Sequence, residues 1–513
     1  METNRKIRSI SEVAAAIDSL RGDGSAPSQP HRKAVVHCHG VFDLLHIGHI
    51  RYLKRARSLG DALVVTVTPD RYVNKGPHRP VFPENLRAEA VAALDCVDFV
   101  AINEWPTAVE TIRALKPDIY AKGAEYRERR TPEIMSEESA LEETGGEMAF
   151  IEDITSSSSH LLNKYLSPFP DKVNQYLGQI SKTYSASKIL QWVNQARGLR
   201  VLVVGETIID EYHYCQTIGR SSKAPLVAMQ HLSHERFAGG AAAVANHLAG
   251  FCDNVGFLSL VGTRDSEEAW IRGKLKSNVH TTLLHKSESP TIVKRRYRES
   301  YFGQPVFEVY MMNDEPLNES DNATLCARLR EMVPQYDLVV VTDYGHGMLS
   351  SEAIQVLCEK ARFLAVNAQV NAGNMGYHFI SKYPRADYIS MAEQELRLES
   401  HSRGGDPHPM LQDLARRLNT ASAVVTRGGR GCLCYGRDAG FYEAPALATH
   451  VVDRVGAGDA FLAVTSLCAV QAAPLEVLAF LGNVAGAEAV ATVGNRDTME
   501  QLPFSRHVEA LLK

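Results

Sequence analysis

The 513-residue sequence has no long uninterrupted run of apolar residues and no cysteine pair of the CxxC type. A membrane-spanning helix needs about 18 or more consecutive apolar residues, so a membrane protein is not predicted. The nine cysteines are odd in number and scattered, which argues against a disulfide framework and against a zinc ribbon. Cys432 and Cys434 lie two residues apart, and we expect them to be ordinary core residues.

The sequence also lacks an excess of positive charge. Its 55 basic and 60 acidic residues give a formal net charge of −5, the wrong sign for a dedicated nucleic-acid binder. A local basic pocket for a small phosphorylated ligand stays compatible with this charge. Residues 1–20 alternate charged and apolar positions and lack the apolar core of a signal peptide. We therefore expect a cytoplasmic protein that binds neither nucleic acid nor a membrane.

What the chain does contain is two regions in which strand-like and helix-like patterns alternate. Such alternation favours parallel sheets with crossover helices. We expect a helical N-terminal arm at 1–30 and a Rossmann-like α/β domain at 31–165. A polar, partly helical connector is expected at 166–198, followed by a larger α/β domain at 199–513.

The most informative segment of the first domain is HGVFDLLHIGH at residues 39–49. It lies where the first predicted strand ends and a helix begins, which is where open α/β sheets bind ligands. Gly40 allows a tight turn, and free N–H groups at a helix start can hold a phosphate. His46 and His49 are three residues apart, so both reach the same side of the first turn. The two side chains can cap the helix, or their N–H groups can stabilise charge on an α-phosphate as pyrophosphate leaves.

This segment resembles the cytidylyltransferase-like nucleotidyltransferases, whose hallmark is GxFDxxHxGH. The resemblance implies in-line attack by a substrate phosphate on the α-phosphate of a nucleoside triphosphate, with Mg²⁺ and without a covalent intermediate. It implies that His46 and His49 are catalytic. It also implies nucleotide contacts from Gly40, Phe42 and Asp43. One departure is His39, where relatives of the heptose pathway usually carry Asn.

Further matches to this family extend to residue 159. Arg79 and Arg87 look like the RP and ERxxxV elements, and the resemblance implies that Arg87 binds substrate. Lys122 opens a KGAEY segment similar to KGxDY, which implies a phosphate contact. Lys75 is as compatible with a phosphate contact as with a solvated surface position. The hydroxyl-rich run at Ser156, Ser157, Ser158 and Ser159 would by itself be an ordinary flexible loop or a helix cap. Its place in the sequence matches a loop of the family, and the resemblance implies that it binds phosphate.

The tetrad at 46–49 reads HIGH, which also occurs in class I aminoacyl-tRNA synthetases. Those enzymes need a second, KMSKS-like lysine loop, and the sequence has none. The negative net charge also argues against a tRNA substrate. The sequence therefore favours a nucleotidyltransferase that acts on small molecules.

The second domain carries DRVGAGDAF at residues 453–461, followed by a long helix of small residues. A glycine-rich turn before a helix start offers backbone N–H groups to a transferring phosphoryl group. Asp459 beside this turn is placed to accept a proton from an attacking hydroxyl. The predicted anion hole consists of Gly456, Ala457 and Gly458.

This motif resembles the ribokinase family of sugar kinases, which implies a ribokinase-like α/β domain with a small β lid and Asp459 as catalytic base. The implied substrate-binding residues are Asp210, Gly239, Gly240 and Asn246. The implied nucleotide-binding residues are Thr426, Gly428 and Gly431. We expect Arg295, Arg296 and Arg298 in the lid. There they either bind a sugar phosphate or are charged side chains that line an exposed strand edge. No Walker A motif is present, so a P-loop kinase is not predicted.

Within this family, residues 205–229 resemble the kinase half of bifunctional heptose-7-phosphate kinase/heptose-1-phosphate nucleotidyltransferases. Those proteins usually place the kinase first, whereas here the nucleotidyltransferase leads. Both chemistries remain available because each site is local to its own domain. The relatives' NxxE element keeps Glu395, the implied metal ligand, but Ala392 stands in place of its Asn. Residues 366–371 depart from the relatives' DPK or DPN as well.

These observations predict a bifunctional enzyme of nucleotide-activated sugar synthesis that uses Mg²⁺, ATP and, as an option, CTP. It would phosphorylate a sugar or sugar phosphate, with heptose 7-phosphate favoured by resemblance, and transfer a nucleotide to the sugar 1-phosphate with release of pyrophosphate. Two alternatives stay open. One is a single-activity nucleotidyltransferase with a non-catalytic sugar-binding or oligomerising domain, and the other is an alcohol-phosphate cytidylyltransferase fused to a kinase. We expect a homodimer, since ribokinase-like domains often pair through their lids.

Overall fold

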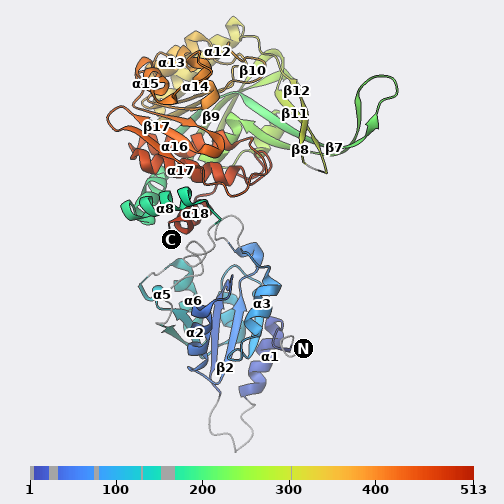
Figure 1. Cartoon of the computed structure of the whole chain (residues 1–513), viewed down its shortest axis with the longest axis vertical. Helices are drawn as coiled ribbons and strands as arrows, with labels where there is room; N and C mark the ends of the chain where they lie inside the picture. Colours follow the sequence, from blue (N-terminus) through green and yellow to red (C-terminus); the bar gives the residue numbers. More distant parts are fainter. Residues whose placement is uncertain are drawn as a thin grey trace, which may run out of the picture. The chain divides into compact units, whose positions relative to one another are not determined.

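The computed structural model of the chain describes residues 5–21, 33–73, 80–128, 131–151, 168–301 and 303–512. The chain divides into two compact units. The first comprises Met1–Pro168 together with Lys513, and the second comprises Phe169–Leu512. Figure 1 shows the helices and strands of each unit.

The first unit is built on a five-stranded parallel sheet with the order β3-β2-β1-β4-β5. Its strands are β1 (Val35–Gly40), β2 (Ala62–Val67), β3 (Phe99–Ile102), β4 (Ile119–Gly123) and β5 (Glu147–Ile151). The chain moves outward from β1 through β2 and β3, then returns to the other side of β1 with β4. Open parallel sheets bind ligands at such a reversal, beyond the carboxyl ends of the strands.

Helices cover both faces of this sheet, since successive strand residues point to opposite sides. They are α1 (Ile10–Arg21), α2 (Ile47–Arg57), α3 (Glu84–Ala92), α4 (Val109–Leu115), α5 (Glu125–Glu128) and α6 (Pro132–Glu143). Val36 and Cys38 pack with α2 and α3, whereas Val35 packs with α1. The stretch expected as an N-terminal arm therefore contains a helix of the core, in which α1 buries Val13 and Ile17.

The second unit is built on a nine-stranded sheet with the order β10-β9-β6-β13-β14-β15-β16-β17-β18. The strands pair in parallel except at β17 and β18, which pair antiparallel. They are β6 (Arg200–Gly205), β9 (Asn254–Arg264), β10 (Val279–Pro290), β13 (Leu338–Asp343), β14 (Leu364–Ala368), β15 (Tyr388–Ala392), β16 (Ser422–Thr426), β17 (Cys432–Gly436) and β18 (Gly440–Ala444). As expected, Cys432 and Cys434 are core residues.

Two groups of helices cover this larger sheet. One face packs against α12 (Glu319–Met332), α13 (Ser351–Lys360), α14 (Glu393–Glu399) and α15 (Pro407–Arg417). The other packs against α8 (Asp171–Thr183), α9 (Ala186–Gln195), α10 (Ala241–Leu248), α11 (Glu268–Lys274), α16 (Ala457–Val470), α17 (Leu475–Ala489) and α18 (Gln501–Leu511). Among the helices that the structure describes, none combines the length and apolarity needed to cross a membrane.

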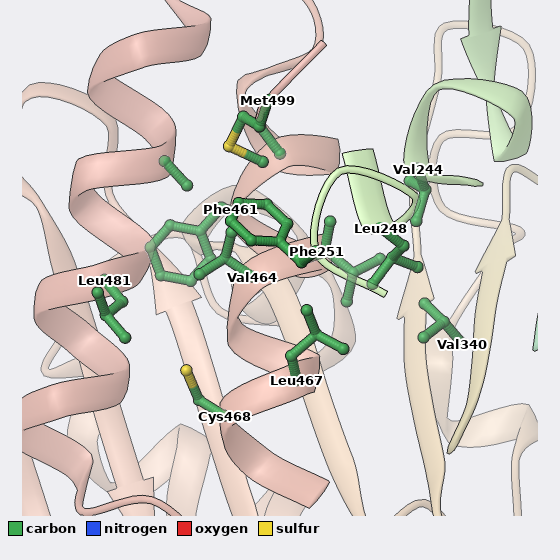
Figure 2. Packing of buried hydrophobic residues seen from close by; sticks show 14 of the residues in the cluster. Val244, Leu248, Phe251, Val340, Phe461, Val464, Leu467, Cys468, Leu481 and Met499 are labelled. Atoms are coloured by element: carbon green, nitrogen blue, oxygen red, sulfur yellow. The ribbon is translucent and has the colours of Figure 1, made fainter. Parts of the chain in front are cut away.

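Helix α16 is enclosed on all sides, because every residue from Ala460 to Ala469 is buried. Figure 2 shows Phe461, Val464 and Leu467 of this helix packed among side chains of neighbouring elements. A Cβ at Gly482 of α17 would lie 2.6 Å from the Phe461 ring, so glycine permits the close approach of these two helices. This packing holds α16 rigidly, and with it the turn that precedes the helix.

The segment expected as a connector belongs to the second unit, which begins at Phe169. Helices α8 and α9 bury one apolar face each in the same core cluster as α16. Their buried residues are Val173, Tyr176, Leu177, Ile180, Ile189, Leu190 and Val193. The segment looked polar in the sequence because only one stripe of each helix is apolar.

A separate four-stranded sheet with the order β12-β11-β7-β8 forms the small β lid of the second unit. Its strands are β7 (Thr207–Arg220), β8 (Val227–Gly240), β11 (Ile292–Glu299) and β12 (Pro305–Met311). The pairing of β11 with β7 ends at Cys215, whereas the pairing of β7 with β8 continues to Arg220. The ends of β7 and β8 form an arm that extends away from the rest of this unit (Figure 1). The predicted fold class, a Rossmann-like domain and a ribokinase-like domain with a lid, is confirmed.

Candidate functional site

A cavity of about 320 Å³ in the second unit lies between the lid, the ends of the sheet strands and the start of α16. It is lined by residues that are far apart in the sequence, from Ile208 to Asp459. Of the residues predicted from the sequence, it brings together Asp210, Gly240, Arg296, Glu395, Thr426, Gly456, Gly458 and Asp459. The cavity is therefore the place in this unit where the predicted chemistry can occur.

Asp459 lies in the first turn of α16 and faces this cavity. The hydroxyl of Tyr344 donates a hydrogen bond to Asp459 Oδ1 over 2.9 Å. Burial raises the pKa of the Asp459 carboxyl to about 7, and the bond from Tyr344 opposes that rise. A general base works best when its pKa lies near the working pH, so this carboxyl is suited to accept a hydroxyl proton near neutrality.

The turn before α16 has the geometry of an anion site. Gly456 has φ +85°, and a Cβ at this position would lie 2.1 Å from Asn495 Oδ1, so the turn requires glycine. A Cβ at Gly458 would meet no atom within 4 Å, which leaves the backbone of the first turn accessible. The first N–H groups of a helix have no partner within the helix and attract anions. Ala457 belongs to the same turn but does not line the cavity.

The lid side of the cavity carries charges of both signs. Asp210 of β7 is buried and forms an ion pair with Arg296 of β11. A Cβ at Gly239 would lie 2.1 Å from Asp210 Oδ2, so glycine at 239 leaves room for this carboxylate. Lys294 also lines the cavity, and burial lowers its pKa. A carboxylate can accept hydrogen bonds from hydroxyl groups, and the neighbouring cations attract an anion. This combination fits a polyol that carries an anionic group such as phosphate.

Three residues predicted to bind ligands are not among those that line this cavity. Asn246 is buried in α10, where its Nδ2 donates to Lys274 O over 2.9 Å and its Oδ1 accepts from Lys276 N over 3.0 Å. A Cβ at Gly431 would lie 1.9 Å from Ala444 O, so this glycine permits the start of the β17–β18 pairing. Gly428 has φ +56° in the turn after β16, and of the predicted nucleotide loop only Thr426 lines the cavity.

Glu395, predicted as a metal ligand, has both carboxylate oxygens engaged by backbone N–H groups. Its Oε2 accepts from Ala392 N over 2.6 Å, and its Oε1 accepts from Val370 N over 3.0 Å. Burial raises the pKa of this carboxyl to about 7. Each carboxylate oxygen keeps a second lone pair, so these contacts leave room for the predicted metal ligation, which stays a proposal. Within the described part of the chain, no group of three or more His, Cys, Asp or Glu side chains is arranged to hold a metal.

In the first unit, the loop between β1 and α2 is strained. Phe42 has φ +50° and Leu44 has φ +53°, in the left-handed region that non-glycine residues rarely adopt. Such strain persists where the surrounding structure imposes it, often at functional sites. Asp43 is buried, and its Oδ1 accepts from Val81 N over 2.9 Å, so it fastens this loop to the chain that precedes α3. Gly40 allows the Phe42 ring to lie close to the strand end.

His46 and His49 lie together at the start of α2, as predicted, with ring centroids 4.0 Å apart. His46 caps the helix, and its Nδ1 accepts from Gly48 N over 3.1 Å. The proton of the neutral His46 ring is therefore on Nε2, which makes that atom a donor. Burial lowers the pKa of His46 and favours this neutral form. The capping function and the predicted phosphate contact use different nitrogens and are compatible.

A hydrogen-bonded chain of side chains that sequence reasoning missed lies beside this loop. Thr66 Oγ1 is 2.8 Å from His37 Nε2 and 2.9 Å from His39 Nδ1, and Thr68 Oγ1 is 3.2 Å from His39 Nε2. Burial and the nearby Lys122 lower the pKa of His37 to about 3, so this ring is neutral. The available signal was two histidines at alternate positions of an otherwise apolar strand, since alternate residues share a face.

Two basic residues predicted to contact ligands are occupied within the protein. Arg87 is only 1% exposed, donates to Phe82 O over 2.9 Å and Thr68 O over 2.8 Å, and pairs with Asp70 at 2.6 Å. It therefore holds the loops at the edge of the sheet. Lys122 is buried at the end of β4 and pairs with Glu137 of α6 at 2.9 Å. The predicted Lys75, Arg79 and Ser156–Ser159 lie outside the described residues.

Curated proteins similar to this chain carry the name bifunctional protein HldE. The protein from Pelobacter propionicus is 38% identical over 160 residues, which is 31% of this chain and 30% of that protein. The protein from Syntrophotalea carbinolica is 41% identical over 129 residues, 25% of this chain and 26% of that protein. The chain thus spans less than a third of the length of these relatives.

Phosphofructokinase-2 from Escherichia coli, solved in complex with potassium, matches 61% of this chain and 100% of its own with a TM-score of 0.50. At 15% sequence identity this match concerns the fold alone. Residues 37–159 match the cytidylyltransferase-like family model. Residues 199–502, more than half of the chain, match the model of the pfkB family of carbohydrate kinases. The chain therefore belongs to the pfkB carbohydrate kinase family.

Proposed function

We propose that the protein is a bifunctional enzyme of activated-sugar synthesis, with the nucleotidyltransferase first in the chain and the kinase second. The single observation that carries the proposal is Asp459 at the start of α16, in one cavity with Lys294, Arg296 and Asp210. The cytidylyltransferase-like match at 37–159 and the relatives named bifunctional protein HldE support the pairing of two activities.

In the kinase reaction, a sugar hydroxyl beside Asp459 attacks the γ-phosphorus of ATP. The hydroxyl proton passes to Asp459, the new bond joins the sugar oxygen to phosphorus, and the bond to the β-phosphate oxygen breaks to release ADP. Backbone N–H groups around Gly456 and Gly458 stabilise the transferred group. Mg²⁺ enters this proposal as a counter-ion that arrives with the triphosphate. Glu395, which lines the same cavity, is the residue that we propose to hold it.

In the nucleotidyl transfer reaction, a phosphate oxygen of a sugar 1-phosphate attacks the α-phosphorus of a nucleoside triphosphate. The bond to the β-phosphate oxygen breaks and pyrophosphate leaves. Donors on His46 and His49 stabilise the charge that develops on the α-phosphate. The close pairing of their rings at the start of α2 supports this assignment.

Heptose 7-phosphate is the sugar that we propose for the kinase, on the resemblance carried by residues 205–229. Lys294 and Arg296 support a phosphorylated sugar because both line the cavity on its lid side. We propose ATP for the kinase and either ATP or CTP for the nucleotidyltransferase. We propose that the enzyme is cytoplasmic.

We also propose that two copies pair through the arm formed by β7 and β8. A two-stranded hairpin is only marginally stable alone, and β8 is an edge strand of the lid. The large apolar residues exposed on the arm are Ile218 (65%), Leu226 (63%), Val227 (61%) and Leu232 (50%). A second copy of this chain would cover these side chains and pair the free edge.

One observation favours a second candidate function. Ala392 lines the cavity in place of the Asn of the relatives' NxxE element, so this position offers no polar side chain to the cavity. This observation favours a nucleotidyltransferase whose second unit binds a sugar phosphate without phosphorylating it.

The deciding experiment is an activity matrix of ATP and CTP against sugar phosphates and sugar 1-phosphates, with Mg²⁺ present. The bifunctional proposal expects ADP from one set of pairs and pyrophosphate from another. Asp459→Asn should abolish only the first product, and His46→Ala only the second. Pyrophosphate without any ADP would favour the second candidate, and ADP at equal rates from wild type and Asp459→Asn would overturn the kinase assignment.

A further inference from the structure

The Tyr344 side chain is in direct contact with Asp459. It follows β13, is only 4% exposed and lines the same cavity. Its hydroxyl donates to Asp459 Oδ1 over 2.9 Å. With Oδ1 engaged in this way, the carboxylate plane is fixed and Oδ2 is the oxygen that can receive a substrate proton. A general base requires such alignment, because a small misplacement costs much of its effect.

Three side chains hold the backbone of Tyr344. The buried carboxylate of Glu206 accepts from Tyr344 N and from His346 N, each over 3.0 Å. Asn371 and Asn374 each donate through Nδ2 to Tyr344 O over 2.9 Å. Both peptide groups that flank the Tyr344 side chain are therefore anchored, and the phenol has a fixed origin from which to reach Asp459.

A buried carboxylate is costly to maintain unless its hydrogen bonds are satisfied. Both oxygens of Glu206 serve this one turn. Burial and the neighbouring Asp343 raise the pKa of Glu206, so the protein maintains the group at a cost in stability. A tyrosine that only filled the core would not need this support. The arrangement is better explained as precise placement of the Tyr344 hydroxyl.

We propose that Tyr344 is a positioning residue for phosphoryl transfer. Its phenol holds one oxygen of Asp459 so that the other faces the attacking hydroxyl, and Glu206 holds the Tyr344 turn in place. The inference rests on the proposed kinase function of the second unit and names a component of that same site.

Tyr344 also affects the pH dependence of the reaction. The bond from Tyr344 lowers the pKa of Asp459, so removal of the phenol hydroxyl raises that pKa further. The other groups that act on Asp459 are Asp210, which raises its pKa, and Lys294 and Arg296, which lower it. Arg454 also lines the cavity. Tyr344→Phe leaves all four in place, so the acidic limb of the kcat/KM profile should move to higher pH.

The experiment compares Tyr344→Phe with Tyr388→Phe in the full-length chain. Tyr388 is an equally buried tyrosine whose hydroxyl bonds to Thr465 Oγ1 over 2.7 Å, within the core of the same unit. ADP formation is followed from acidic to alkaline pH with ATP, Mg²⁺ and the best sugar substrate from the activity matrix. We expect Tyr344→Phe to lower kcat about tenfold near neutrality and to move the acidic midpoint up by about one pH unit, with KM for ATP unchanged. Tyr388→Phe should leave the midpoint where it is in wild type.

An unchanged midpoint in a folded Tyr344→Phe protein overturns the inference while the kinase function stands. A wild-type protein that forms no ADP overturns both, so the two failures are distinguishable. If Tyr344→Phe does not fold, Glu206→Gln provides the second test. It keeps the phenol and loosens its turn, and it should shift the midpoint in the same direction. Equal shifts in Glu206→Gln and Tyr388→Phe would contradict the positioning role.

Discussion

The rings of His46 and His49 lie with their centroids 4.0 Å apart at the start of α2, and the Phe42 and His49 rings form an edge-type contact with centroids 5.5 Å apart. His46 also caps the helix through Nδ1. The strained loop and the helix start therefore place two imidazoles side by side where the sheet order reverses. This pair is the geometric basis of the proposed nucleotidyl transfer.

His46→Ala and His49→Ala should each lower pyrophosphate release by about 10²–10³-fold, because each removes a donor from the developing phosphate charge. The double variant should lose less than the product of the two effects, since adjacent donors act as a unit. A coupled pyrophosphatase assay measures the rates. His280→Ala, at an exposed position of β10 in the other unit, is the matched control. Full activity in both single variants would contradict the assignment.

Asp459→Asn should lower ADP formation by about 10²–10⁴-fold, the usual contribution of a general base. Since burial raises the pKa of Asp459 to about 7, wild-type kcat/KM should fall as the pH drops below that value. Pyrophosphate release by the same variant should equal that of wild type, because the two sites are in different units. A flat wild-type profile through neutral pH would argue against Asp459 as the base.

The same pKa predicts an effect on stability. A carboxyl whose folded pKa exceeds its ordinary value penalises the folded state once the unfolded group ionises. The penalty is absent below the ordinary pKa of 3.8, grows as the pH rises to about 7 and stays constant above that pH. Asp459→Asn should therefore raise Tm at pH values above 7 and have little effect near pH 3.8. Thermal unfolding across this range measures the difference, and a Tm gain independent of pH would refute the prediction.

The parts of the site that could be predicted from sequence are those fixed by local geometry. His46 and His49 share a side of one helical turn, so their spacing alone brings the two rings together. Asp459 follows a glycine turn within three residues, so its spacing alone places it beside that turn. The resulting positions agree with the structure. The fold class was also predictable, because strands that alternate with helices favour parallel sheets with crossover helices.

The parts that could not be predicted depend on the direction of single side chains. Arg87, Asn246 and Glu395 are at motif positions, yet each bonds to nearby backbone groups, and only the packed tertiary structure decides this. The chain through His37 and Thr66 joins two strands whose register is not visible in one sequence. Tyr344 reaches Asp459 across 115 residues of sequence, so no local pattern could reveal the contact.

Gly239→Ala tests the placement of Asp210. The added Cβ would lie 2.1 Å from Asp210 Oδ2, so the carboxylate must move. We expect KM for the sugar phosphate to rise by about tenfold, the effect of disturbing one charged hydrogen bond, with KM for ATP unchanged. Gly178→Ala in α8 is the matched control, since its Cβ would meet no atom within 4 Å. That control should keep the activity and gain about 0.5–1 kcal/mol of stability. Equal KM values for Gly239→Ala and wild type would show that Asp210 does not hold the sugar.

The arm of the lid provides the test of the proposed dimer. Ile218 and Leu226 are 65% and 63% exposed, so Ile218→Asp and Leu226→Asp should leave the folded chain intact while placing charge in the contact between copies. We expect wild type to have the mass of a dimer by light scattering and the double variant the mass of a monomer. Tyr377→Asp, at a position 91% exposed and outside the lid, is the control and should remain a dimer. A wild-type monomer, or a double variant that stays dimeric, would exclude this arm as the pairing surface.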